Sequence, residues 1–106
     1  MIQGIESYLK SERSKLERIV ARLEEECEAR PRGALVMKRR GNGEYAYVVR
    51  REEGRVVTRY VGKAGSWQAR TVDAKLGERR KYEEELDHAR AELRKITRMM
   101  KAGGIF

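Results

Sequence analysis

The net positive charge is concentrated in the middle third of the chain, where acidic residues are few. Residues 31–65 hold 9 basic and 3 acidic residues, a net charge of +6 in a chain whose total is +8. Seven of the nine are arginines, whose planar guanidinium groups bind phosphate oxygens through parallel N–H donors. The composition predicts a phosphate-bearing ligand here, with candidate contacts at Arg39, Arg40, Arg50, Arg51, Arg55, Arg59 and Lys63. The alternative is that strand edges carry these charges to prevent aggregation.

Three tyrosines lie among these cations. Tyr45, Tyr47 and Tyr60 fall on one face of adjacent predicted strands. Tyrosine rings on a sheet can stack on nucleobases, with guanidinium groups beside them on the phosphates. A cross-strand tyrosine pair also packs well in a core beneath amphipathic helices. The sequence leaves both interpretations open.

The loop Gly-Lys-Ala-Gly-Ser at residues 62–66 is a second candidate anion site. A glycine-rich loop before a helix presents backbone N–H groups to phosphate. It is not a Walker A loop, because Val57 and Ala64 stand where that motif requires glycine and serine or threonine. The alternative interpretation is a plain strand-to-helix connection in which Ser66 is the helix N-cap.

The sequence contains no pattern typical of catalysis or metal binding. His88 is the only histidine, and it has no cysteine within ligand spacing. The acidic runs at 24–26 and 83–85 surround their helices as solvated faces and do not form an acid/base pair. The single cysteine, Cys27, is expected to be a small packing residue. We therefore expect no enzymatic activity, no cofactor and no bound metal.

The hydrophobic spacing predicts a helix, a β-meander and a second helix. Apolar residues recur every three or four positions over 2–30 and 66–102, the period of a helix that packs along one stripe. Over 34–62 the period is two, with turn residues at 41–43 and 53–54. We expect an α+β fold in which two long helices, as an antiparallel hairpin or coiled coil, flank a three-stranded antiparallel meander. Residues 103–106 are expected to form an apolar tail.

The turns set the register of the two predicted hairpins. A two-residue loop at 53–54 places Tyr47 opposite Tyr60. The first hairpin has two possible loops, Asn42–Gly43 alone or all of Gly41–Gly43.

Length and cysteine content limit the class of protein. A chain of 106 residues is expected to form one domain over residues 1–106. One cysteine cannot form an intrachain disulfide, which indicates an intracellular protein. The first residues have neither a basic region nor the apolar run of a signal peptide or membrane span. We expect a cytoplasmic protein that does not contact membranes.

The predicted helices are longer than the meander can cover. About 28 helical residues span roughly 40 Å, whereas a seven-residue strand spans about 23 Å. We therefore expect the chain to bind itself, as a homodimer or higher oligomer, through the apolar seams of its helices. The seam residues are Ile2, Ile5, Leu9, Leu16, Ile19 and Leu23, then Tyr82, Leu86, Ala89, Leu93, Ile96 and Met100.

Three segments resemble a known group of sequences. Arg-Gly-Ala-Leu-Val at 32–36, Tyr-Ala-Tyr at 45–47 and Thr-Arg-Tyr-Val-Gly-Lys at 58–63 are similar to the "GSL, YYY, YIGK" meander of short uncharacterised bacterial and phage proteins, a domain-of-unknown-function group. That resemblance implies a meander between two helices and a mobile-element or phage context, with no stated activity. A weaker similarity to the arm-binding domain of tyrosine recombinases implies DNA contact.

Three functional hypotheses follow from these features. The first is a non-enzymatic oligomeric module that binds nucleic acid through the basic meander. The second is a phage-type anti-defence protein that sequesters a nucleotide second messenger between subunits. The third is a coiled-coil scaffold or inhibitor that binds another protein through its helices.

Overall fold

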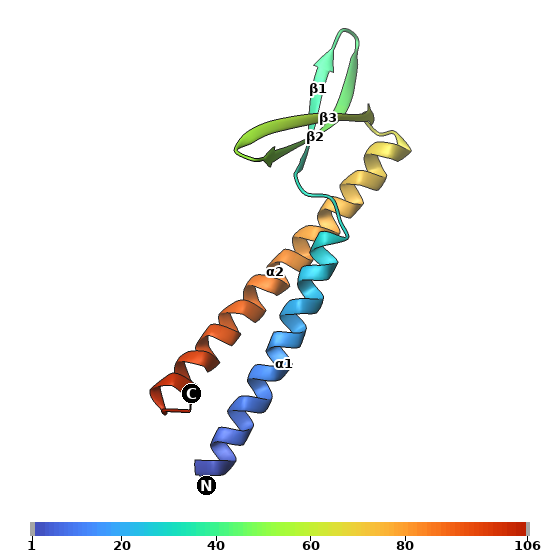
Figure 1. The fold of residues 1–106 in the computed structure, drawn as a ribbon. Helices are drawn as coiled ribbons and strands as arrows, with labels where there is room; N and C mark the ends of the chain where they lie inside the picture. Colours follow the sequence, from blue (N-terminus) through green and yellow to red (C-terminus); the bar gives the residue numbers. More distant parts are fainter. Residues whose placement is uncertain (1, 106) are drawn as a thin grey trace. The chain divides into compact units, whose positions relative to one another are not determined.

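The computed structural model describes residues 2–105 (Figure 1). Its elements follow in the order α1 (Ile2–Glu28), β1 (Ala34–Arg40), β2 (Gly43–Glu52), β3 (Arg55–Lys63) and α2 (Trp67–Ala102). The predicted α+β class, with two long helices flanking an antiparallel meander, is confirmed. The chain divides into two compact units. The helical unit consists of the residues up to Cys27 and those from Tyr82 onward, and the sheet unit spans Glu28–Lys81.

In the helical unit, α1 packs antiparallel to the later turns of α2 (Figure 1). The core consists of Leu23 and Cys27 from α1 with Leu86 and Ala89 from α2, and Val20 and Tyr82 pack against its edge. Across the surface of this pair, the Arg90 guanidinium lies 3.2 Å from a Glu24 carboxylate oxygen. Apolar side chains at a spacing of three and four residues therefore hold the two helices together.

Both helices end at residues that break helical geometry. The helix α1 ends at Glu28, two residues before the expected limit, because Pro31 disfavours helical geometry in the residue before it. After α2, Gly104 takes a positive φ of 69°, and the N–H of Ile105 donates to the carbonyl of Met100 at 2.9 Å. This is the Schellman arrangement, which ties Ile105 back to the last turn. Phe106, the other apolar residue of the predicted tail, lies outside the described residues.

The sheet has the strand order β1-β2-β3, and both pairs of strands are antiparallel. The predicted turn at Glu53–Gly54 and the pairing of Tyr47 with Tyr60 are confirmed. Both turn residues have positive φ, 49° and 79°, as a type I′ turn requires. Toward the end of β3 a bulge shifts the register, so that Ala46 pairs with Gly62.

Neither expected loop of the first hairpin is correct. Arg40 pairs with Gly43, which leaves Gly41 and Asn42 as a two-residue loop. Gly41 has a φ of 61°, at the first loop position, where a type II′ turn favours glycine. The loop therefore uses the earlier of the two glycines, and every pairing between β1 and β2 follows from that choice.

The two faces of the sheet differ in their surroundings. Ala46 is completely buried, and within the same unit Ala69 and Leu76 of α2 are also buried. A methyl group added at Gly62, the partner of Ala46, would lie 2.9 Å from the hydroxyl of Ser66. This face, called the Ala46 face, is thus covered where the chain turns into α2. The opposite face carries the tyrosines.

Among the described residues, neither helix contains an apolar stretch sufficient to span a lipid bilayer.

Candidate anion-binding surface

The strand register gathers three tyrosines on one face of the sheet. Tyr47 and Tyr60 are directly paired, with ring centroids 5.5 Å apart and planes inclined at 64°. The ring centroid of Tyr45 lies 6.2 Å from that of Tyr60, and the two ring planes are inclined at 53°. These are edge-to-face and tilted contacts, the geometry that aromatic quadrupoles favour. The three rings form a continuous aromatic cluster across β2 and β3.

This cluster faces solvent. Tyr60 is 55% exposed and its neighbour on the same face, Val56, is 62% exposed, while Tyr45 and Tyr47 are half-buried. The interpretation of the tyrosines as a core under the helices does not hold for Tyr60, and the one fully buried residue of the described strands, Ala46, lies on the opposite face. The sequence alone does not distinguish the two faces, since both alternate with the same period.

Four cations share the face with the tyrosines. In the register, Lys38 and Lys63 flank Tyr45 from the two neighbouring strands. The Lys38 ammonium lies 5.2 Å from the centroid of the Tyr47 ring, within cation–π distance. Arg40 and Arg51 occupy the same side of β1 and β2. We call this surface the tyrosine face, and its polar and aromatic members are Lys38, Arg40, Tyr45, Tyr47, Arg51, Thr58, Tyr60 and Lys63.

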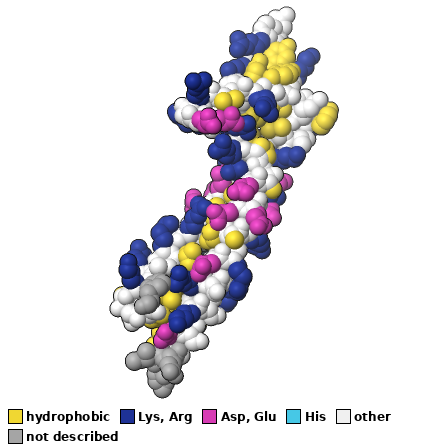
Figure 2. All heavy atoms as spheres, in the orientation of Figure 1, with side chains coloured by type: hydrophobic (Ala, Val, Ile, Leu, Met, Phe, Trp, Pro, Cys, Tyr) yellow, Lys and Arg dark blue, Asp and Glu magenta, His cyan; other side chains and the backbone are white. Residues whose placement is uncertain are grey.

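The tyrosine face is positive without local compensation. Among the paired positions of the described strands that share it, none is acidic. In Figure 2, hydrophobic and basic side chains lie next to one another over the sheet, beside a small group of acidic side chains. An aromatic cluster bordered by four uncompensated cations is suited to a ligand that carries both flat rings and negative charge.

The remaining meander arginines lie on the opposite side. Arg39, Arg50, Arg55 and Arg59 alternate with the tyrosine-face residues and belong to the Ala46 face. Two of them have acidic neighbours. The Arg39 guanidinium lies 3.8 Å from Glu44, and Arg50 forms an ion pair with Glu52. The structure thus divides the predicted cations between two faces, and only Arg40, Arg51 and Lys63 of that set accompany the tyrosines.

Ser66 has a structural role in the loop that follows β3. Its hydroxyl accepts a hydrogen bond from the N–H of Ala69 at 3.2 Å, which is the N-cap contact that begins α2. The N–H groups of Ala64 and Ser66 donate to the carbonyls of Glu44 and Lys63 at 3.0 Å. These two N–H groups therefore hold the turn and do not point to a phosphate cradle in this loop.

Two further groups of cations were not predicted from the sequence. In the sheet unit, a surface hollow of about 540 Å³ is lined by Arg30, Arg32, Arg50 and Arg79. Some of these arginines also form ion pairs or hydrogen bonds with other groups of the chain. For example, the Arg30 Nε lies 2.9 Å from Glu78, and Arg79 donates to the Arg30 carbonyl at 2.9 Å. Because its members come from separated segments, no local pattern predicts this hollow.

In the helical unit, a second hollow of about 470 Å³ follows one side of α2. Its cations are Arg90, Arg94, Arg98 and Lys101. The spacing of four residues between the three arginines places them on one helical stripe. That spacing is visible in the sequence, although the acidic run at 83–85 lowers the net charge of the surrounding segment.

The described part of the chain contains no group of three histidine, cysteine or acidic side chains that could hold a metal ion. Cys27 is buried in the helical core, and His88 lies exposed on α2.

Comparisons with known proteins give a family and no function. A protein-family model described as a domain of unknown function (DUF6788) matches residues 8–70, which is more than half of the chain. The match covers most of α1, the whole meander and the first turn of α2. No curated protein and no solved structure matches the chain.

Proposed function

Starting from the fact that the chain belongs to the DUF6788 family, we propose that it is a non-enzymatic module that binds single-stranded nucleic acid on the tyrosine face. The observation that carries this proposal is the arrangement of Tyr45, Tyr47 and the largely exposed Tyr60 on one face of the sheet, bordered by four cations and no paired carboxylate. We place this activity in the cytoplasm of a bacterial or phage-infected cell, on the basis of the resemblance and the single cysteine.

The rings favour a single strand over a duplex. In a duplex the bases are stacked on each other, so their flat faces are not accessible to tyrosine side chains. In a single strand the bases can turn outward and stack on aromatic rings, which contributes about 1–3 kcal/mol per base. The exposed ring of Tyr60 and the half-exposed rings beside it offer such a platform.

The cations supply the second half of the interaction. Lys38 and Lys63 lie on either side of Tyr45. If a base stacks on the Tyr45 ring, the phosphate of that nucleotide lies near one of these two ammonium groups. Arg40 and Arg51 extend the positive surface along the strands. A phosphate chain that crosses the face would thus meet positive charge at several successive nucleotides.

Salt dependence of binding tests the proposal. If four phosphates are neutralised, the logarithm of the association constant should fall with the logarithm of salt concentration at a slope of about −3 for a single strand. Replacing Arg51→Gln and Lys63→Gln together should make that slope shallower by about 1.4, because two contacts are lost. Fluorescence anisotropy with a labelled oligonucleotide measures both slopes.

The matched control changes the opposite side of the same sheet. The pair Arg55→Gln and Arg59→Gln removes the same amount of charge from the Ala46 face, and we expect the slope to stay within experimental error of the wild type. If the Arg55→Gln and Arg59→Gln variant makes the salt slope as shallow as the Arg51→Gln and Lys63→Gln variant does, binding is not located on the tyrosine face. Loss of salt dependence in the wild type would contradict the proposal altogether.

The same experiments separate the other two hypotheses. A sequestered nucleotide would bind as tightly as an oligonucleotide and raise the melting temperature at micromolar concentration. A protein scaffold would bind neither ligand, and changes on the tyrosine face would leave its activity unaffected.

A further inference from the structure

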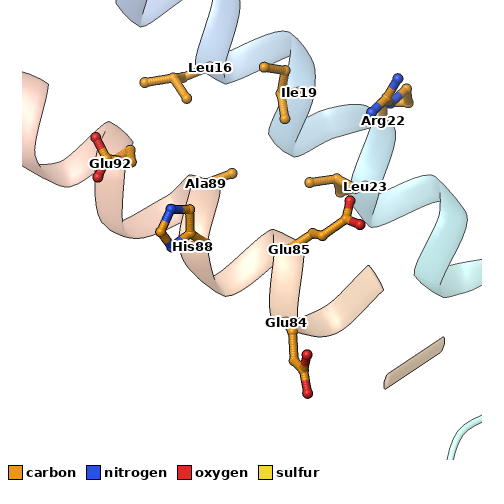
Figure 3. A pocket seen from close by; sticks show the side chains of 9 residues that line it. All are labelled: Leu16, Ile19, Arg22, Leu23, Glu84, Glu85, His88, Ala89 and Glu92. Carbon is orange, nitrogen blue, oxygen red and sulfur yellow. The ribbon is translucent and has the colours of Figure 1, made fainter. Parts of the chain in front are cut away.

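The helical unit carries an apolar groove between its two helices. The groove is lined by Leu16, Ile19 and Leu23 of α1 and by Ala89 of α2, and its volume is about 510 Å³ (Figure 3). Ile19 is 37% exposed although its position in the seam predicts a buried side chain. The helix pair therefore leaves part of its own apolar seam in contact with water.

Further exposed apolar side chains lie along both helices. Ile5 lies two heptads before Ile19 on α1 and is 62% exposed. On α2, Met99 lies one heptad after Glu92, which lines the groove, and it is 52% exposed. Positions seven residues apart face the same side of a packed helix, so Ile5 and Met99 lie on the sides of the helices that line the groove, with Glu12 between Ile5 and Ile19 on α1. Apolar side chains that are exposed along a groove and bordered by charged residues are typical of an interaction surface.

The two rims of the groove have opposite charge. Arg22 lines the α1 side, whereas Glu85 and Glu92 line the α2 side (Figure 3). A surface with one basic and one acidic rim can be complementary to a copy of itself, which is the requirement for an interface with two-fold symmetry. An unrelated partner would not need to share this pattern.

We propose that this groove binds the groove of a second copy of the chain, so that two helix pairs form a four-helix homodimer. The charges specify the arrangement. A two-fold axis parallel to the helices places α1 of each copy against α2 of the other, and Arg22 then meets the acidic rim of the second copy twice. An axis across the helices would place the acidic rims together, which like-charge repulsion disfavours.

The first test is the mass in solution. Light scattering at micromolar concentration should give twice the chain mass of 12.3 kDa. Ile19→Asp places a charge in the groove at a side chain that is already partly exposed, so we expect a folded monomer. The control is Ala21→Asp, which adds the same charge to the same helix at an exposed position outside the groove lining and should remain dimeric. Circular dichroism checks that both variants keep their helices.

The second test is a charge exchange. Arg22→Glu and Glu85→Arg alone should each weaken the dimer about tenfold, because each replaces two attractive contacts by repulsion. The double variant should recover most of the wild-type affinity. The proposal is overturned if the wild-type chain stays monomeric or if the Ile19→Asp variant remains dimeric. It is also overturned if the double variant dimerises no better than the single ones, or if the groove binds only the helix of a different protein.

Discussion

Replacing Tyr47→Ala and Tyr60→Ala together is expected to weaken binding of a single-stranded oligonucleotide by at least about 30-fold. The two rings are paired at 5.5 Å on the open face, and each stacked base that is lost costs about 1–3 kcal/mol. Fluorescence anisotropy at fixed salt measures the change, and circular dichroism confirms that the sheet is retained.

The matched control keeps the rings and removes only the hydroxyl groups. The variant with Tyr47→Phe and Tyr60→Phe should bind within about threefold of the wild type, because stacking depends on the aromatic face. If the phenylalanine variant is as defective as the alanine variant, the tyrosines act through their hydroxyl groups. If the alanine variant binds normally, stacking on this face plays no part in binding.

The second large effect concerns stability. Gly33→Ala is expected to destabilise the protein by about 3 kcal/mol, because two penalties combine. Gly33 has a φ of 118°, where side chains other than glycine are strained, and a methyl group there would lie 2.6 Å from the carbonyl oxygen of Val49. That oxygen belongs to the backbone of β2 and cannot move without disturbing the sheet.

Chemical denaturation measures this loss, and Gly77→Ala supplies the control. Gly77 lies within α2, and the only contact of an added methyl group would be at 3.7 Å from the end of the Arg80 side chain. We expect this change to stabilise the protein by about 1 kcal/mol, since alanine has the higher helix propensity. Equal stability of the Gly33→Ala variant and the wild type would show that the chain can enter β1 in another conformation.

Local sequence signals account for much of the fold. Glu53–Gly54 specifies its turn because both residues adopt positive φ, so the pairing of Tyr47 with Tyr60 could be predicted. Gly41–Gly43 contains two glycines around one asparagine, and either can satisfy a hairpin turn. The choice between them depends on how β1 packs, which the local sequence does not encode. The bulge beside Ala46 is unpredictable for the same reason.

The candidate site was only partly predictable. Its residue types were correct, because arginine and tyrosine density is a property of composition. Their assignment to one face or the other depends on the strand register that the structure shows. Arg51 and Tyr60 share a face, whereas Arg50 and Arg59 lie on the other. Which face is open depends on where α2 begins, and Ser66 fixes that point through its N-cap contact. The arginines that line the hollow with Arg79 are distant in sequence, so only the folded chain brings them together.

The most direct test of the central claim is a map of the residues that a nucleic acid perturbs. Nuclear magnetic resonance spectra of the isotope-labelled protein, recorded with a single-stranded oligonucleotide of about ten nucleotides, report which side chains change their surroundings. Our account predicts the largest shifts in the ring signals of Tyr45, Tyr47 and Tyr60, together with Lys38 and Lys63, and small shifts at Arg55 and Arg59. Shifts confined to the Ala46 face or to the stripe of Arg90, Arg94 and Arg98 would contradict it.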